Sequence, residues 1–173
     1  MRAFFKRDRE DVEPFGITVD RAPRREDVRK LEEGLDGHAV AQAGITPPKD
    51  VAIYLRDEGG HIVGGLAGVE WGGNFHIRLL WVHEDYRGEG YGTRLVAAAE
   101  QEAVARGCRQ VTVSTFSYQA PDFYTRLGFE EYATLDDMPA GHRKHYFRKL
   151  LEDAPPGAER VQESQADGVD GAE

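Results

Sequence analysis

Three apolar segments separated by very short links constrain the fold of this chain more than any other feature. The segments are VAIYLR (51–56), HIVGGLAGVEW (61–71) and FHIRLLWV (75–82), and the links between them are DEGG and GGN. Links this short allow consecutive strands to pair only in the antiparallel direction. The sequence therefore predicts three successive antiparallel strands in the middle of the chain.

From Gly90 onward the apolar residues change from the alternation of a strand to the period of a helix. A strand that follows such a helix can lie parallel to the strand before it. One helical stripe is formed by Gly92, Leu95, Val96, Ala99 and Ala103. The other predicted elements are a strand at 16–19, a helix at 24–35, a loop or broken helix at 36–49, a strand at 111–116, a short helix at 121–128, and strands at 129–135 and 145–150.

This order predicts an α/β (α+β) fold with a mixed, mostly antiparallel central sheet of about seven strands and helices on both faces. We expect a flexible N-terminus over 1–14, one domain over 15–150 and a disordered acidic tail over 151–173. The tail has seven acidic residues and one arginine, so most of the formal net charge of −9 belongs to it.

Composition excludes several classes of partner. The negative net charge argues against nucleic acid, because phosphate contacts need lysine and arginine patches. No apolar run approaches the length that crosses a bilayer, and the N-terminus lacks a secretory pattern, so we expect no membrane association and a cytoplasmic protein. The single cysteine, Cys108, is expected to be a packing residue, and no cluster with metal-ligand spacing is present, so no metal is expected.

The turn RGEGYGT (87–93) places three glycines and an arginine between the segment 75–82 and the helical stripe. Glycines let backbone amides approach a ligand closely, and the first N–H groups of a helix are unpaired and partly positive. The turn is therefore a candidate anion site, with Arg87 either adding charge or bracing the turn. The P-loop pattern and the GxGxxG fingerprint are both absent, which leaves R-x-x-G-x-G.

The pattern R-x-x-G-x-G after an apolar strand, together with FYTRLGF (123–129), resembles the GNAT superfamily of N-acetyltransferases, with a likeness that spans most of the expected domain. The resemblance implies acetyl-CoA as co-substrate and a sheet that is splayed where the cofactor binds. Carried onto this sequence, it implies that the cofactor is bound by Leu80, Trp81, Val82, Arg87, Gly88, Glu89, Gly90, Tyr91, Gly92 and Thr93.

The segment 75–82 also shows a break in its alternation at Leu80 and Trp81, which a β-bulge or burial of both faces would produce. In the family a bulge in this strand leaves an amide free to face the thioester carbonyl. We therefore expect the contacts of Leu80, Trp81 and Val82 with the cofactor to be made by the main chain.

The family resemblance implies direct transfer of the acetyl group to an amine. Tyr124 matches the position of the family's tyrosine and is the candidate general acid, the alternative being a core tyrosine. His76 is the candidate general base, with Glu70 or a water chain as rivals and a plain surface role as the alternative. Arg78 could bind an anionic group of the acceptor or pair with a carboxylate.

The acceptor itself has no readable code in the sequence. We expect a small-molecule amine or a peptide amine, in a pocket that Trp71, Trp81 and Tyr118 could line. A non-catalytic acyl-CoA-binding sensor or interaction module is the alternative function, and a nucleotide-binding protein is a third. A homodimer is possible, for example by pairing of the segment 145–150 as an edge strand with a second copy.

Overall fold

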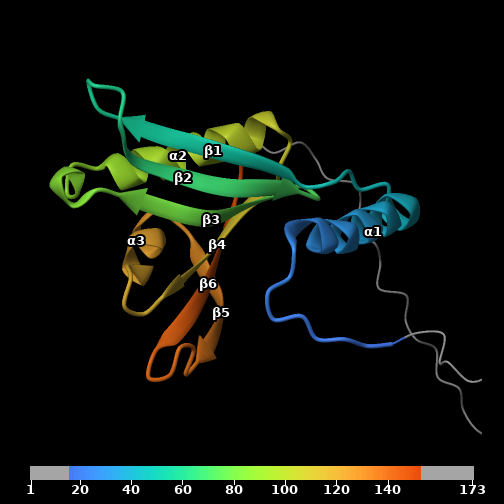
Figure 1. Ribbon diagram of the computed structural model, residues 1–173. Coiled ribbons are helices and arrows are strands. Elements are labelled where there is room, and N and C mark those ends of the chain that lie inside the picture. Colours follow the sequence, from blue (N-terminus) through green and yellow to red (C-terminus); the bar gives the residue numbers. More distant parts are fainter. Residues whose placement is uncertain (1–15, 153–173) are drawn as a thin grey trace, which may run out of the picture.

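The computed structural model describes residues 16–152, which are coloured in Figure 1. The predicted flexible N-terminus (1–14) lies outside the described residues, as does all of the predicted acidic tail except residues 151 and 152. Within the described part, no helix is long and apolar enough to cross a membrane.

Six strands form one sheet in the order β1-β2-β3-β4-β6-β5, and all neighbours are antiparallel except β3 and β4. The three successive antiparallel strands and the parallel fourth are therefore confirmed. The sheet is mixed, mostly antiparallel and flanked by helices, as predicted, with six strands where about seven were expected. The strands are β1 (Lys49–Arg56), β2 (Ile62–Trp71), β3 (Asn74–Val82), β4 (Gln110–Phe116), β5 (Glu130–Asp136) and β6 (Arg143–Leu150).

The difference in strand number comes from the segment 16–19. The sequence predicts a strand there, and this prediction is wrong. The segment has no regular structure, and Ile17 is fully exposed. Two apolar residues in a four-residue segment satisfy the alternation of a strand, but a strand also needs a neighbour with free backbone groups.

The helices are α1 (Arg25–Ala43), the short 3₁₀ helix η1 (Glu84–Tyr86), α2 (Tyr91–Ala105) and α3 (Pro121–Arg126). The prediction of a loop or broken helix over 36–49 is wrong for its first half, because α1 continues to Ala43. The helix ends at Gly44, whose positive φ of 64° lets its N–H bond to the Val40 carbonyl. None of the residues of α1 is buried, and Figure 1 shows the helix beside one end of the sheet.

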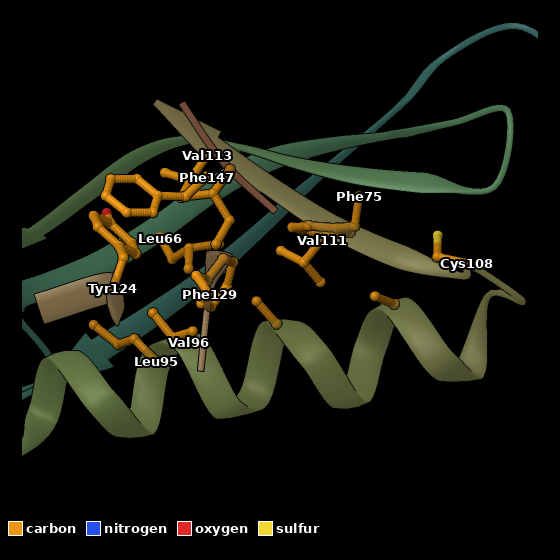
Figure 2. Close-up of a cluster of buried hydrophobic side chains, with 13 residues drawn as sticks. Leu66, Phe75, Leu95, Val96, Cys108, Val111, Val113, Tyr124, Phe129 and Phe147 are labelled. Carbon is orange, nitrogen blue, oxygen red and sulfur yellow. The ribbon is translucent and has the colours of Figure 1, made fainter. Parts of the chain in front are cut away.

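The core lies between α2 and the sheet (Figure 2). Phe75, Val111 and Phe147 come from three neighbouring strands and are almost completely buried. In Figure 2 the core side chains of the sheet point toward α2, with Tyr124 at one end of the cluster and Cys108 at the other. Cys108 is fully buried, in keeping with a packing residue, and burial raises the pKa of its thiol. The buried residues of α2 are Leu95, Val96, Ala99 and Ala103, as the helical stripe predicts.

The prediction that segment 145–150 forms a free edge is wrong. This segment belongs to β6, which pairs with β4 on one side and β5 on the other, so its backbone groups are already used. The edges of the described sheet are β1 and β5. Sequential strands often pair with each other, but β6 inserts between β4 and β5, and no local pattern encodes that insertion.

Candidate active site

The candidate site lies next to a β-bulge in β3. Gly68 of β2 lies opposite Ile77 and its neighbour Ala67 lies opposite Leu79, so Arg78 is the extra residue. The sequence predicts a disturbance at Leu80 and Trp81, and the bulge that the structure contains lies two residues earlier. The alternation breaks after the inserted residue, because insertion exchanges the faces of all residues that follow it.

Beyond the bulge, β3 and β4 separate. Their parallel pairing runs from Asn74 with Gln110 to Ile77 with Val113 and then stops, although β4 continues to pair with β6 as far as Phe116. The splay that the family resemblance implies is therefore present in the sheet. A cavity of about 910 Å³ opens at this point, between the two strands, the start of α2 and α3.

Most of the predicted cofactor residues line this cavity. They are Leu80, Trp81, Val82, Arg87, Gly88, Gly90, Tyr91, Gly92 and Thr93, and Tyr124 lines it as well. Glu89 and His76 do not line it. Of the predicted acceptor-pocket aromatics, Trp81 and Tyr118 line the cavity and Trp71, at the far end of β2, does not.

The sequence reasoning missed the contribution of β4 and the segment that follows it. The missed lining residues there include Ser114, Thr115, Gln119, Phe123 and Arg126, and Leu79 of β3 was missed as well. Gln119 is held by the Thr115 hydroxyl at 2.8 Å and the Phe116 N–H at 3.0 Å, both of which bond to its side-chain oxygen. The available signal was the parallel pairing of 111–116 with a strand that contains a bulge, because the residues after the last paired position must border the opening.

The glycine-rich turn has the backbone that an anion site needs. Gly88 and Gly90 have positive φ angles of 82° and 77°, which favour glycine, and Gly90 is the N-cap of α2. Arg87 braces the turn by donating from Nε to the Val82 carbonyl at 2.9 Å. The turn is thereby connected to the end of β3, and the residues that carry the first N–H groups of α2, Tyr91, Gly92 and Thr93, line the cavity.

Gly92 differs from the other two glycines of the turn. It has no positive φ, and an added Cβ would meet only the Phe123 ring, at 3.4 and 3.5 Å, which is ordinary contact. Neither backbone conformation nor packing therefore requires a glycine here. A ligand that approaches the backbone closely would require it, so this position fits a bound phosphate.

Tyr124 combines a buried ring with a hydroxyl at the cavity. Its ring packs edge-on against Phe123 and Phe129, with centroids at 5.1 and 5.7 Å, and lies tilted against Phe147 at 5.8 Å. Burial raises the pKa of its phenol to about 12, so the hydroxyl stays protonated at neutral pH. Among residues 16–152 no side chain or backbone group hydrogen-bonds this hydroxyl, and it is not a fully buried atom.

His76 lies on the face of the sheet opposite α2, at the last paired positions before the splay. Its Nδ1 is 3.0 Å from the Thr112 hydroxyl. Half-burial and the charges of Arg78 and Lys144 lower its pKa below the ordinary value, so its imidazole is neutral at neutral pH. The rival base Glu70 pairs with Phe75, on the face covered by α2, and is therefore separated from His76 by the sheet.

The charged side chains that line the cavity are all arginines, Arg78, Arg87 and Arg126, and no carboxylate is among the lining residues. Arg78 also bonds to Asp50 on β1. Of the two roles expected for this arginine, the structure therefore contains the pairing with a carboxylate. Within the described ranges no three His, Cys, Asp or Glu side chains converge on a possible metal position. The cavity thus suits an anionic ligand.

Comparison with known proteins agrees with this geometry. The model of the acetyltransferase (GNAT) family matches residues 18–129. Blasticidin-S acetyltransferase of Streptomyces morookaense is 41% identical over 107 residues, which are 61% of this chain and 78% of that protein. An acetyltransferase of Agrobacterium fabrum is 30% identical over 121 residues, 70% of this chain and 88% of its own length.

A solved acetyltransferase from Bacillus cereus superposes with a TM-score of 0.67 at 31% identity, covering 78% of this chain and 98% of its own. The chain therefore belongs to the GNAT acetyltransferase family. It falls in the class of acetyl-CoA-dependent N-acetyltransferases, and the resemblance inferred from R-x-x-G-x-G and FYTRLGF is confirmed.

Proposed function

We propose that this protein transfers the acetyl group of acetyl-CoA to the primary amine of a small molecule. The observation that carries the proposal is the single cavity surface that joins the glycine turn, the splayed strands and the Tyr124 hydroxyl. These three parts supply what direct transfer needs, namely an anion site, a slot for an extended chain and a proton donor.

In this proposal the backbone N–H groups of the turn 88–93 hold the pyrophosphate, and the bare backbone at Gly92 allows the close approach. The pantetheine arm occupies the opening between β3 and β4. A main-chain N–H of the segment 80–82, beyond the bulge, donates to the thioester carbonyl and stabilises the oxyanion that forms on it. Acetyl-CoA supplies the activated acetyl group.

Tyr124 is the proposed general acid. The neutral amine attacks the thioester carbonyl, the carbon–sulfur bond of the tetrahedral intermediate breaks, and the thiolate takes the phenolic proton of Tyr124. The proton that the amine loses passes to solvent or to a base. With a pKa of about 12, Tyr124 begins each cycle protonated, and the tyrosinate that forms takes a proton back from solvent.

His76 is the proposed polar group at the acceptor side. It precedes the cavity residues Ile77 and Arg78 on β3, and it is neutral at neutral pH, which a general base requires and which leaves one ring N–H free to donate.

A small-molecule acceptor is supported by the aromatic surface at the opening. Tyr118 stacks on Phe116 with centroids 5.3 Å apart and meets His142 edge-on at 4.9 Å. This arrangement offers a flat surface for a planar group. The lining has no carboxylate that would attract a lysine side chain or a polyamine, and the relative from Streptomyces morookaense is a blasticidin-S acetyltransferase.

The experiment measures thiol release from acetyl-CoA with a panel that contains blasticidin S, amino sugars, spermidine and a lysine peptide. We compare the wild type with Tyr124→Phe, and use Tyr132→Phe, a half-exposed tyrosine on the edge strand β5, as the matched control. We expect turnover with a small planar amine, a loss of about 10²-fold in kcat in Tyr124→Phe, and no change in the control.

Two results would count against the proposal. Turnover with the lysine peptide alone would replace the small-molecule acceptor by a peptide amine. If coenzyme A raises the melting temperature but no amine is acetylated, the result would favour a non-catalytic acyl-CoA-binding module.

A further inference from the structure

Three side chains form a hydrogen-bonded cluster on the sheet face opposite α2, at the paired end of the splay. Asn74 and His76 come from β3, and Thr112 comes from the parallel strand β4. Asn74 Nδ2 donates to Thr112 Oγ1 at 3.0 Å, and the same hydroxyl oxygen is 3.0 Å from His76 Nδ1. The Thr112 hydroxyl is therefore the link between the amide and the imidazole.

The direction of the first bond favours one direction for the second, because the hydroxyl hydrogen of Thr112 then needs an acceptor. Because Thr112 Oγ1 accepts from Asn74, its own hydrogen is free to donate, and His76 Nδ1 is the acceptor within reach among the described residues. An Nδ1 that accepts a hydrogen bond carries no proton. A neutral ring in this state has its proton on Nε2.

Burial and the charges around His76 keep the ring neutral. Thr112 has Arg148 of β6 beside it, and Arg78 and Lys144 also lie near the ring. The carboxylates on the same face are occupied, since Asp50 bonds to Arg78 and Glu130 lies 3.9 Å from Arg148. Half-burial and the charges of Arg78 and Lys144 both lower the pKa of His76, so the neutral form is favoured.

The opposite orientation of the Asn74 amide is the competing arrangement. Asn74 Oδ1 is buried without a partner, and a reversed amide would accept the hydroxyl hydrogen of Thr112 instead. Reversal would also move two N–H donors into that buried position. A buried carbonyl oxygen without a partner is tolerated more often than a buried N–H, which favours the orientation described above.

We propose that Asn74 and Thr112 are positioning residues that hold His76 as the neutral Nε2–H tautomer. His76 then acts toward the acceptor as a hydrogen-bond donor through Nε2 and not as the general base. The role toward the acceptor rests on the proposed function, whereas the tautomer is a property of the folded chain alone. The acceptor then binds as the neutral amine, and water takes the proton that the nitrogen loses after it attacks.

The tautomer is tested first, by long-range ¹H–¹⁵N NMR of the histidine side chains of the full chain at neutral pH, with His76 assigned from its loss in His76→Gln. We expect a protonated Nε2 and an unprotonated Nδ1. Thr112→Val should convert this into a mixture of tautomers, Thr112→Ser should restore it, and Thr134→Val on the edge strand is the control. A wild-type ring with its proton on Nδ1 would overturn the proposal.

Activity tests the second part. Glutamine places an amide N–H near the position of Nε2 but cannot accept a proton, so His76→Gln should keep kcat/KM within about fivefold of wild type, while His76→Leu loses about tenfold or more. A base role predicts instead a comparable loss of about 10²-fold or more in both variants. If the wild type acetylates no amine, the proposed function fails while the NMR result still decides the tautomer.

Discussion

The two halves of β3 both carry large apolar residues but lie in different surroundings. In the paired half, from Asn74 to Ile77, strands flank both sides and the side chains of Phe75 and Ile77 are 0% and 2% exposed. In the splayed half, Leu79 and Trp81 are 67% and 48% exposed. The apolar residues of the first half therefore stabilise the fold, whereas Leu79 and Trp81 of the second half leave much of their surface at the cavity.

The largest difference between the halves should appear on removal of one aromatic ring from each. Phe75→Ala should lower the free energy of unfolding by about 3–5 kcal/mol, because it leaves a cavity in a close-packed core. Trp81→Ala should cost less than about 1 kcal/mol, since nearly half of the side chain is already exposed. Urea denaturation measures both, and equal losses would show that the two halves are equally part of the core.

A second prediction concerns Tyr124, which joins the core to the cavity. Its pKa is about 12 in the folded protein and 10 is the ordinary value, so the unfolded chain releases the phenolic proton first as the pH rises. The stability due to the neutral phenol is complete below pH 10 and is lost between pH 10 and 12, by up to about 1.4 kcal/mol per pH unit.

Unfolding titrations of the wild type and Tyr124→Phe at pH 9 to 11 measure this loss. The free energy of unfolding should fall less steeply with pH in the variant than in the wild type. If the free energy of unfolding falls equally steeply with pH in both proteins, the phenol is as well solvated in the folded protein as in the unfolded chain.

A third prediction tests the glycine that lies opposite the bulge. A Cβ at Gly68 would lie 2.6 Å from the His76 carbonyl oxygen and 2.7 Å from Phe75 Cε1, so Gly68→Ala should destabilise the protein by about 1–3 kcal/mol. The strain falls at the boundary between the two halves. A neutral result in urea denaturation would show that the bulge can shift along β3.

The smallest effect on stability is expected at Gly92, where the alanine substitution is sterically acceptable. Gly92→Ala should leave the free energy of unfolding unchanged or raise it by up to about 1 kcal/mol, because alanine is the better helix former. Calorimetric titration should show coenzyme A binding about tenfold more weakly, a difference of about 1.4 kcal/mol. Unchanged affinity for coenzyme A would show that no phosphate binds at this part of the turn.

The same contrast explains what the sequence could predict. The paired half of β3 follows from the short links and from alternation, and the helical stripe of α2 from its period, because these patterns are local. The break in alternation also indicated the bulge. The strand order, by contrast, depends on β6 inserting between β4 and β5, and the contribution of Ser114 and Gln119 to the cavity depends on how far two strands separate.

For the site, the motif residues were predictable because R-x-x-G-x-G between a strand and a helix, together with FYTRLGF, matched the motifs of the family. Tyr124 followed from its place in FYTRLGF, and ten of the twelve predicted site residues line the cavity. The sequence could not choose between His76 and Glu70, because the two lie on opposite faces of the sheet and the faces depend on register. Their roles in the reaction stay predictions.

The arginine lining of the cavity has a kinetic consequence. The chain as a whole carries a formal charge of −9 and repels anions at long range, but Arg78, Arg87 and Arg126 make the local potential at the opening positive. Added salt screens the arginines and should slow the capture of coenzyme A, while the arrival of an uncharged acceptor is unaffected. Ionic strength would thus change which of the two substrates reaches the enzyme first.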